Sequence, residues 1–217
     1  MESYSESEAA PPVFDLSGGH PALDLVNTLD DRFAEAGPVE LLTDYGGLLR
    51  FAQQTELLQP GQVRLLTKSV RPQAAAGALR SARELREALA AAFYGSLERR
   101  PPPDPDVRTL ERHFLAAQQH RQLQWREAAA RHGQAGMAWR WGRFEKEAEL
   151  PVWILAQQAA QLVLSDSMQR VRACGADTCR WLFLDTSKNH TRRWCNMRIC
   201  GNRVKARRFQ ARRAAEH

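Results

Sequence analysis

Cysteine is scarce in this sequence, and long apolar runs are absent. All four cysteines of the 217 residues lie between positions 174 and 200, so a disulfide or metal framework can form only there. No apolar run approaches the ~20 residues that a helix needs to cross a bilayer, so we expect no membrane-spanning segment. The first eight residues are acidic and have no apolar core, so we expect no secretory signal peptide and a cytoplasmic location.

Recognisable catalytic motifs are also missing. The chain contains no nucleophile elbow, no phosphate-binding glycine loop and no dinucleotide fingerprint. Its six histidines are scattered, and only His190 lies among the cysteines. We therefore predict that the protein is not an enzyme. An enzymatic N-terminal region that uses the cysteine-containing segment as a docking module remains an alternative.

Hydrophobic residues make up 43% of the chain, which is enough to build a core. Before the cysteines, apolar residues recur mainly at helical spacing. We expect a short strand at 13–16 and then a helix from Pro21 to the break at Gly37-Pro38, with Phe33 on its apolar face. Further helices are expected at about 44–57, 63–66, 72–99 and 110–117, and from Pro151 onward.

Two stretches follow a different period. Residues 123–125 and 137–141 alternate apolar with polar or small side chains, which predicts the two strands of a β-hairpin. We expect Trp139, Trp141 and Trp153 to pack in the core, or else to line a ligand pocket. The predicted fold class is therefore mostly α (α+β), a helical N-terminal domain with a small β-hairpin element.

The four cysteines form two close pairs. Four residues separate Cys174 from Cys179, four separate Cys195 from Cys200, and fifteen separate the two pairs. This spacing suits a tetrahedral four-thiolate zinc site, which the reducing cytoplasm favours over two disulfides. We predict one structural Zn²⁺ ion held by all four cysteines. Such a site has no open position for catalysis, although His190 could replace one cysteine.

Positive charge is concentrated after the first cysteine. From Cys174 onward there are 11 Lys and Arg and 3 Asp and Glu, a net charge of +8, whereas the preceding part carries −2. A charge run is usually a solvated surface, but one that follows a zinc site predicts a helix that binds double-stranded DNA. The predicted DNA-binding residues are Arg192, Arg193, Asn202, Arg203, Lys205, Arg207, Arg208, Arg212 and Arg213. Asn202 could read an adenine edge or cap the helix.

Two tryptophans lie beside the cysteines. Trp181 follows Cys179 by two positions, and Trp194 directly precedes Cys195. Small zinc modules bury little else, so we expect these rings to form the core of the module, with base stacking as the alternative. Two other functions stay open. The module could bind RNA, or it could sense oxidants, because basic surroundings lower the pKa of a thiol and oxidation would release zinc.

These motifs resemble a known family. Residues 200–203 read Cys-Gly-Asn-Arg, and together with residues 181–185 and 193–197 they resemble the CGNR zinc finger. Residues 23–28 and 85–89 are similar to the ABATE domain that accompanies this finger. The resemblance covers nearly the whole chain.

The resemblance implies a bacterial, stress-induced transcription regulator. Its finger would bind DNA, and its N-terminal domain would sense a small-molecule effector. The candidate effector residues are Asp24 and Asn27, which belong to the matching motif, and Arg32, which is a nearby cation. A buried hydrogen-bond network is the alternative role for Asn27. We divide the chain into a disordered arm at 1–12, an ABATE-like domain at 13–171 and a CGNR finger at 172–217. A homodimer would suit such a regulator, although no residue proves one.

Overall fold

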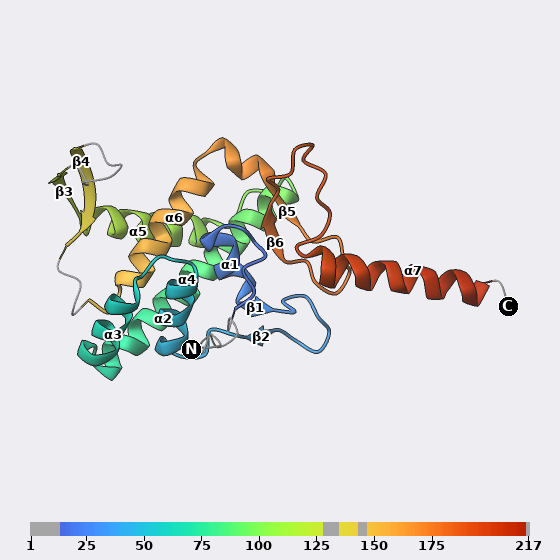
Figure 1. Cartoon of the computed structure of the whole chain (residues 1–217), viewed down its shortest axis with the longest axis horizontal. Helices are drawn as coiled ribbons and strands as arrows, with labels where there is room; N and C mark the ends of the chain where they lie inside the picture. The colour runs from blue at the N-terminus through green and yellow to red at the C-terminus, as the bar shows by residue number, and fades with distance from the viewer. Residues whose placement is uncertain (1–13, 128–134, 143–146, 216–217) are drawn as a thin grey trace, which may run out of the picture.

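The computed structural model describes residues 14–127, 135–142 and 147–215. The predicted arm at 1–12 lies outside these ranges, as do the side chains of residues 208, 212, 214 and 215. In the described ranges the chain forms a helical body with three small antiparallel hairpins, and a C-terminal helix leaves the body at one end (Figure 1). The protein is thus mostly helical and ends in a small four-cysteine module, as predicted.

The described helices are α1 (Pro21–Asn27), α2 (Tyr45–Gln54), α3 (Pro60–Ser69), α4 (Pro72–Leu97), α5 (Asp104–Gln119), α6 (Leu150–Val163) and α7 (Asn202–Ala215). A 3₁₀ turn, η1 (Asp166–Arg170), and a π-helical turn, η2 (Met197–Gly201), lie between α6 and α7. The paired strands are β1 (Leu29–Asp30) with β2 (Val39–Glu40), β3 (Arg121–Arg126) with β4 (Gly136–Trp141), and β5 (Val171–Ala173) with β6 (Leu182–Leu184). None of the described helices is long and apolar enough to cross a membrane.

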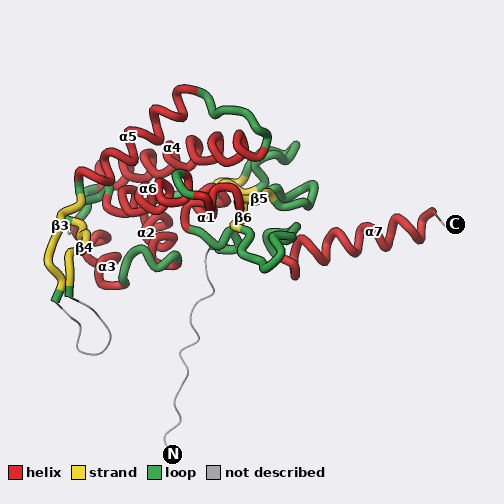
Figure 2. The backbone as a smooth tube through the Cα atoms, turned by 90° about the horizontal axis from the view of Figure 1, so that it is seen from above, coloured by secondary structure: helices red, strands yellow, loops and turns green. Residues whose placement is uncertain are grey.

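The long helix α4 is the centre of the body (Figure 2). Its buried residues recur every three or four positions from Ala78 to Phe93, so it has a continuous apolar stripe. Helices α1, α2, α5 and α6 pack against α4. Proline occupies the first turn of α1, α3, α4, α5 and α6, where its missing N–H is no loss.

The short helix α1 lies inside the molecule. Six of its seven residues are buried, and it packs on α4, on α6 and on strand β6 of the cysteine module. Helix α1 therefore joins the body to the cysteine-containing segment.

Several predictions for this part were wrong. The helix predicted from Pro21 ends at Asn27, because the chain turns into β1 and Asp31 adopts a left-handed φ of 47°. Phe33 consequently lies on the surface, 58% exposed. The described residues 14–16 form no strand. Trp139 is exposed on β4, whereas Trp141 and Trp153 pack against the core.

Candidate metal centre and nucleic-acid interface

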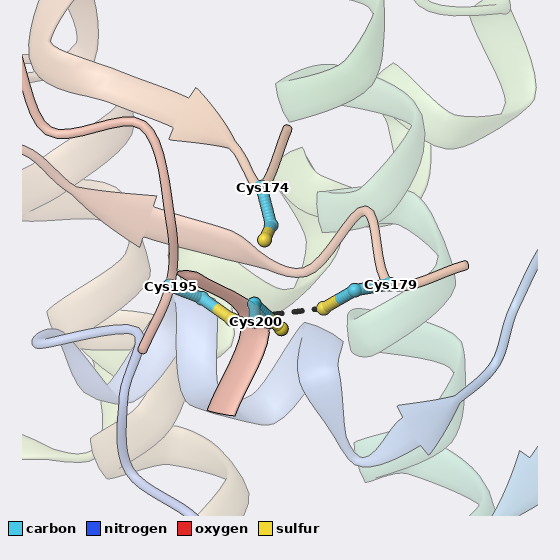
Figure 3. Close-up of side chains that lie close together, drawn as sticks. All are labelled: Cys174, Cys179, Cys195 and Cys200. Carbon is cyan, nitrogen blue, oxygen red and sulfur yellow. Dashed lines mark hydrogen bonds between the residues drawn. The ribbon is translucent and has the colours of Figure 1, made fainter. Parts of the chain in front are cut away.

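The four cysteines come together from two stretches of the chain, 174–179 and 195–200 (Figure 3). Their sulfur atoms all lie within 4.8 Å of one another. The Sγ of Cys195 is 3.6 Å from that of Cys179 and 3.7 Å from that of Cys200. Tetrahedral zinc with Zn–S bonds of about 2.3 Å separates its sulfurs by about 3.8 Å, whereas a disulfide joins them at about 2.0 Å. The sulfur positions therefore fit one tetrahedral zinc ion and do not fit two disulfides.

The electrostatics of the four thiols also fit a cation. Hydrogen bonds with Cys179 and Cys195 lower the pKa of Cys174, while hydrogen bonding to Cys174 raises the pKa of Cys195. Without a cation the four groups compete for protons, because like charges so close together disfavour one another. A bound divalent ion would let all four ionise and would supply structural cross-linking of the two cysteine pairs.

Backbone hydrogen bonds fix the segments that carry the cysteines. The N–H of Cys174 donates to the carbonyl oxygen of Trp181 at 2.8 Å, and that of Cys200 donates to Asn196 at 2.9 Å. Trp181, Trp194 and the fully buried Phe183 pack with the cysteines in a small core, as the sequence predicted for the two tryptophans. The hydrogen bonds and packing of the protein thus fix the segments that carry the cysteines.

Asp185 organises the loop between the cysteine pairs, and the sequence reasoning missed it. Its fully buried carboxylate accepts hydrogen bonds from the hydroxyl and N–H of Ser187, at 2.6 and 3.0 Å, and from the N–H of Arg192 at 3.1 Å. These bonds, that of the Ser187 hydroxyl above all, hold the pKa of Asp185 below its ordinary value. The available signal was an Asp followed two residues later by Ser, a common turn pattern.

The cysteine module is joined to the body by side-chain and backbone hydrogen bonds. The side-chain amide of Asn27 donates to the carbonyl oxygen of Leu182 and accepts from its N–H, both at 2.9 Å. The indole of Trp181 donates to Asp30 at 2.7 Å, and the Leu184 N–H donates to the Gly18 carbonyl at 2.8 Å. Strand β6 is therefore bonded along its length to the segment that contains α1.

The three candidate effector residues lie in different surroundings. Asn27 is 3% exposed and has both polar atoms occupied by Leu182, which is the arrangement of the hydrogen-bond-network alternative. Asp24 is also buried and accepts a 2.8 Å hydrogen bond from the Gly18 N–H. The pKa of Asp24 is raised to about 7; burial is the main cause, the charge of Asp15 acts in the same direction, and the hydrogen bond from Gly18 opposes both.

Arg32 lies apart from these two residues, at a surface cavity. It forms an ion pair with Glu87 and lines a hollow of about 340 Å³ together with Phe33, Tyr94 and the prolines 101–103. The Nε of Arg32 is buried and has no hydrogen-bond partner among the described residues. Of the three candidates, Arg32 is the one beside a cavity that a small molecule could enter.

The predicted DNA-binding residues divide into engaged and exposed cations. The Arg192 guanidinium donates to the carbonyls of Ser17, Trp194 and Cys195 and lies 4.4 Å above the ring of Phe183. Its donors are therefore engaged in contacts within the protein. The exposed residues are Arg193, Asn202, Arg203, Lys205, Arg207 and Arg213, whereas the side chains of Arg208 and Arg212 lie outside the structural description.

Asn202 does not cap the helix that it begins. The side chain of Asn196 accepts from the Arg198 N–H at 3.0 Å and caps η2, which continues directly into α7. Asn202 is left exposed in the first turn of α7. Beyond Val204, which packs on the small core, α7 extends away from the body (Figure 1).

A helical body that carries a four-cysteine zinc module is the architecture of a zinc-finger protein. Residues 19–166 match the family model of the ABATE domain, which is described as "Putative stress-induced transcription regulator", and residues 170–213 match that of the CGNR zinc finger. The chain therefore belongs to the ABATE family and carries a C-terminal CGNR zinc finger, so the resemblance read from its motifs is confirmed. No curated protein matches the chain.

Proposed function

We propose that the protein is a zinc-dependent transcription regulator that binds double-stranded DNA in the bacterial cytoplasm, as part of a stress response. The observation that carries this proposal is the positive charge and the exposure of α7. All six charged residues among its 14 are Arg or Lys, and no element of the described ranges covers the helix where it leaves the four-cysteine module (Figure 2). A helix of this length spans about 21 Å, and the major groove of B-DNA is wide enough to admit it.

The exposed cations of α7 would contact phosphates. Lys205 lies on another side of the helix, whereas Arg203 and Arg207 lie four residues apart on one side. Like charges at this spacing repel in the free helix, and neighbouring phosphates would relieve the repulsion. Asn202, exposed beside the zinc module, is the residue that we propose for a base contact, since an amide can bond to adenine in the major groove.

The zinc ion has a positioning role in this proposal. It holds Cys200 against the other cysteines, one residue before η2 passes into α7, and so fixes the direction in which the helix leaves. Four thiolates close the coordination sphere, which supports a regulator in preference to a zinc enzyme. Loss of zinc would leave the cations in place but without a defined orientation.

An effector would act through the cavity beside Arg32. The Tyr94 hydroxyl, in the wall of this cavity, donates to the carbonyl of Arg180 at 3.0 Å, and the Arg180 guanidinium lies 5.5 Å from the ring of Phe33. Arg180 directly follows the zinc-module residue Cys179. We therefore propose Arg32 as an effector contact and Tyr94 as the link by which the bound effector shifts the module.

The test is binding of the full-length, zinc-loaded protein to fluorescent duplex DNA across a salt series. Arg207→Ala should weaken binding and reduce the salt slope by about 0.9, the value for one lost phosphate contact. Arg64→Ala removes the same charge from an exposed position on α3 and serves as the control. Chelation of zinc should abolish saturable binding, and excess RNA should compete only weakly. If zinc-loaded protein binds no duplex, the proposal fails.

Oxidant sensing is a second candidate function with one observation in its favour. Cys179 is partly exposed, whereas Cys174, Cys195 and Cys200 are buried. Cys179 also lines a cavity of about 250 Å³ through which a small oxidant could reach the sulfur. If the protein senses oxidants, peroxide should release zinc and DNA together, and a reductant with added zinc should restore both. Unchanged zinc content after peroxide treatment would contradict this role.

A further inference from the structure

The β3–β4 hairpin presents an uncovered apolar surface. Opposite residues in the register are Leu123 with Trp139 and Trp125 with Met137, so these four side chains share one side of the hairpin. They are 53, 55, 62 and 59% exposed, respectively. We call Leu123, Trp125, Met137 and Trp139 the hairpin face. Exposed apolar clusters that contain two tryptophans are typical of interaction sites.

The proposed DNA-binding function does not use this surface. The hairpin lies at the end of the body opposite α7 in both views (Figures 1 and 2). The other side of the same strands is polar and carries Gln122, Gln124, Arg126 and Arg140. Apart from Arg121 at the start of β3, the side opposite these polar residues is apolar, so one side is suited to a partner and the other to water.

We propose that the hairpin face binds the same face of a second copy of the chain, across a two-fold axis. The arrangement of large and small side chains supports a self-complementary contact. Trp125 and Trp139 occupy diagonal corners of the four-residue square, and Leu123 and Met137 occupy the other two. A two-fold axis along the strands, or across them, places each tryptophan against a leucine or methionine of the partner copy. Such large-against-small contacts allow close packing.

The charges of the hairpin are compatible with pairing of identical copies. Strands β3 and β4 contain Arg121, Arg126 and Arg140 and no acidic residue. Arg126 and Arg140 lie on the polar side and point away from the proposed contact, so their charges would not oppose their symmetry mates. By register Arg121, at the start of β3, lies on the same side as the hairpin face; its guanidinium lies 4.7 Å above the ring of Trp139 and donates to Gln157 at 2.8 Å within its own protomer. A partner that brought further charges to this face would have to desolvate them as well.

The size of the hairpin face sets the expected strength of the dimer. A tryptophan side chain buries up to about 250 Å² when fully covered, so the four side chains together offer roughly 400 Å² per copy. Two copies would bury about 800 Å², which is below the roughly 1,200–2,000 Å² of stable specific interfaces and fits only a weak, transient contact. We therefore expect a reversible dimer with a dissociation constant in the micromolar range. In this dimer both copies of α7 stay uncovered.

The experiment is sedimentation velocity of the full-length, zinc-loaded protein from about 1 to 200 µM, a range that brackets a micromolar dissociation constant. The wild type should pass from monomer to dimer. Trp125→Ser should weaken the dimer at least tenfold, because interface tryptophans contribute most to such contacts. Gln124→Ser changes the adjacent residue on the polar side and should leave the dimer unchanged.

Two readouts make the result decisive. Far-UV circular dichroism and zinc content should be the same in Trp125→Ser as in the wild type, since the ring is mostly exposed. Met137→Lys is a second substitution on the hairpin face and should also weaken the dimer. A protein that stays monomeric at about 200 µM, or dimers that tolerate both substitutions, would overturn the proposal. Affinity for a short duplex that holds one protomer should be unaffected, so this outcome is independent of the DNA-binding proposal.

Discussion

The hairpins β5–β6 and β3–β4 differ in what covers them. Each strand of β5–β6 has only three residues, yet Val171, Leu182 and Phe183 are at most 2% exposed. Each strand of β3–β4 has six residues, and its apolar side is open to solvent. An isolated two-stranded hairpin is only marginally stable in water. For β5–β6, contacts outside the hairpin, from α1 and the four-cysteine core, are therefore more important than strand length.

Among the changes that test this comparison, removal of zinc should have the largest effect on the stability of the protein. We expect Cys200→Ser, or chelation, to lower the melting temperature by at least about 10 °C, because the metal holds the small core on one side of β5–β6. Differential scanning fluorimetry with measured zinc content tests this. His190→Ala is the control in the same loop, and it should keep its zinc. Zinc loss in His190→Ala with retention in Cys200→Ser would instead make His190 a ligand.

Asn27→Ala should have the next largest effect. It leaves the buried N–H and carbonyl of Leu182 without partners, at a cost of roughly 2–4 kcal/mol in the free energy of unfolding. Urea denaturation measures this cost, and faster hydrogen exchange of the Leu182 amide would locate it. Asn189→Ala, in an exposed position of the zinc module, is the matched control. Equal stability of the two variants would show that the Asn27–Leu182 bonds contribute little.

The buried carboxyl group of Asp24, which contacts β6 through Gly18, should make the stability of the protein depend on pH. Asp24 accepts a hydrogen bond from the Gly18 N–H, and the Gly18 carbonyl accepts one from the Leu184 N–H. Mainly because of burial, the pKa of Asp24 is raised from 3.8 to about 7. The folded protein therefore keeps a proton that the unfolded chain releases, so stability falls as the pH rises from about 4 to 7.

Asp24→Asn removes this titration and keeps the acceptor for the Gly18 N–H. It should raise the free energy of unfolding at pH 8 by roughly 2–4 kcal/mol and flatten the profile, as measured by urea denaturation at several pH values. Asp15→Asn, which changes an exposed neighbouring carboxylate, should flatten the profile only slightly. A lower stability of Asp24→Asn at pH 8 would show that the ionised form is the stabilising one.

The smallest effect is expected on the uncovered hairpin. In dilute, monomeric protein Trp125→Ser should change the free energy of unfolding by less than about 0.5 kcal/mol, because the ring is already in water. Phe183→Ala, on the covered hairpin, should cost about 3–5 kcal/mol by the same measurement. A large loss of stability in Trp125→Ser at low protein concentration would mean that Trp125 packs against residues of its own protomer.

Periodicity and spacing predicted the features that local sequence controls. The helices α2 to α6, the strands β3 and β4, and the clustering of the four cysteines follow from apolar repeats, turn residues and pair spacing. Alternation at β3–β4 could not say whether the apolar side would be covered, so Trp139 was wrongly placed in the core. That question depends on surfaces remote in sequence.

Long-range bonds explain most of what the sequence could not predict. Asn27 ends α1 beside Leu182, 155 residues later, and no local pattern contains that pairing. The guanidinium of Arg192, a predicted DNA contact, bonds to Ser17 at a sequence separation of 175 residues. Strands β5 and β6 are too short to give a periodic signal. The sequence therefore predicted the clustering of the four cysteines well, and it predicted their attachment to the body poorly.

The bonds between Asn27 and Leu182 also constrain the order of folding. During synthesis the backbone groups that pair with Asn27 are made 155 residues after it. Contacts of such long sequence separation form late, because a large loop must close first. The buried amide of Asn27 would therefore stay unpaired until residue 182 has been translated. A chain that stops before residue 182 should leave that part of the core open and become a substrate for chaperones and proteases.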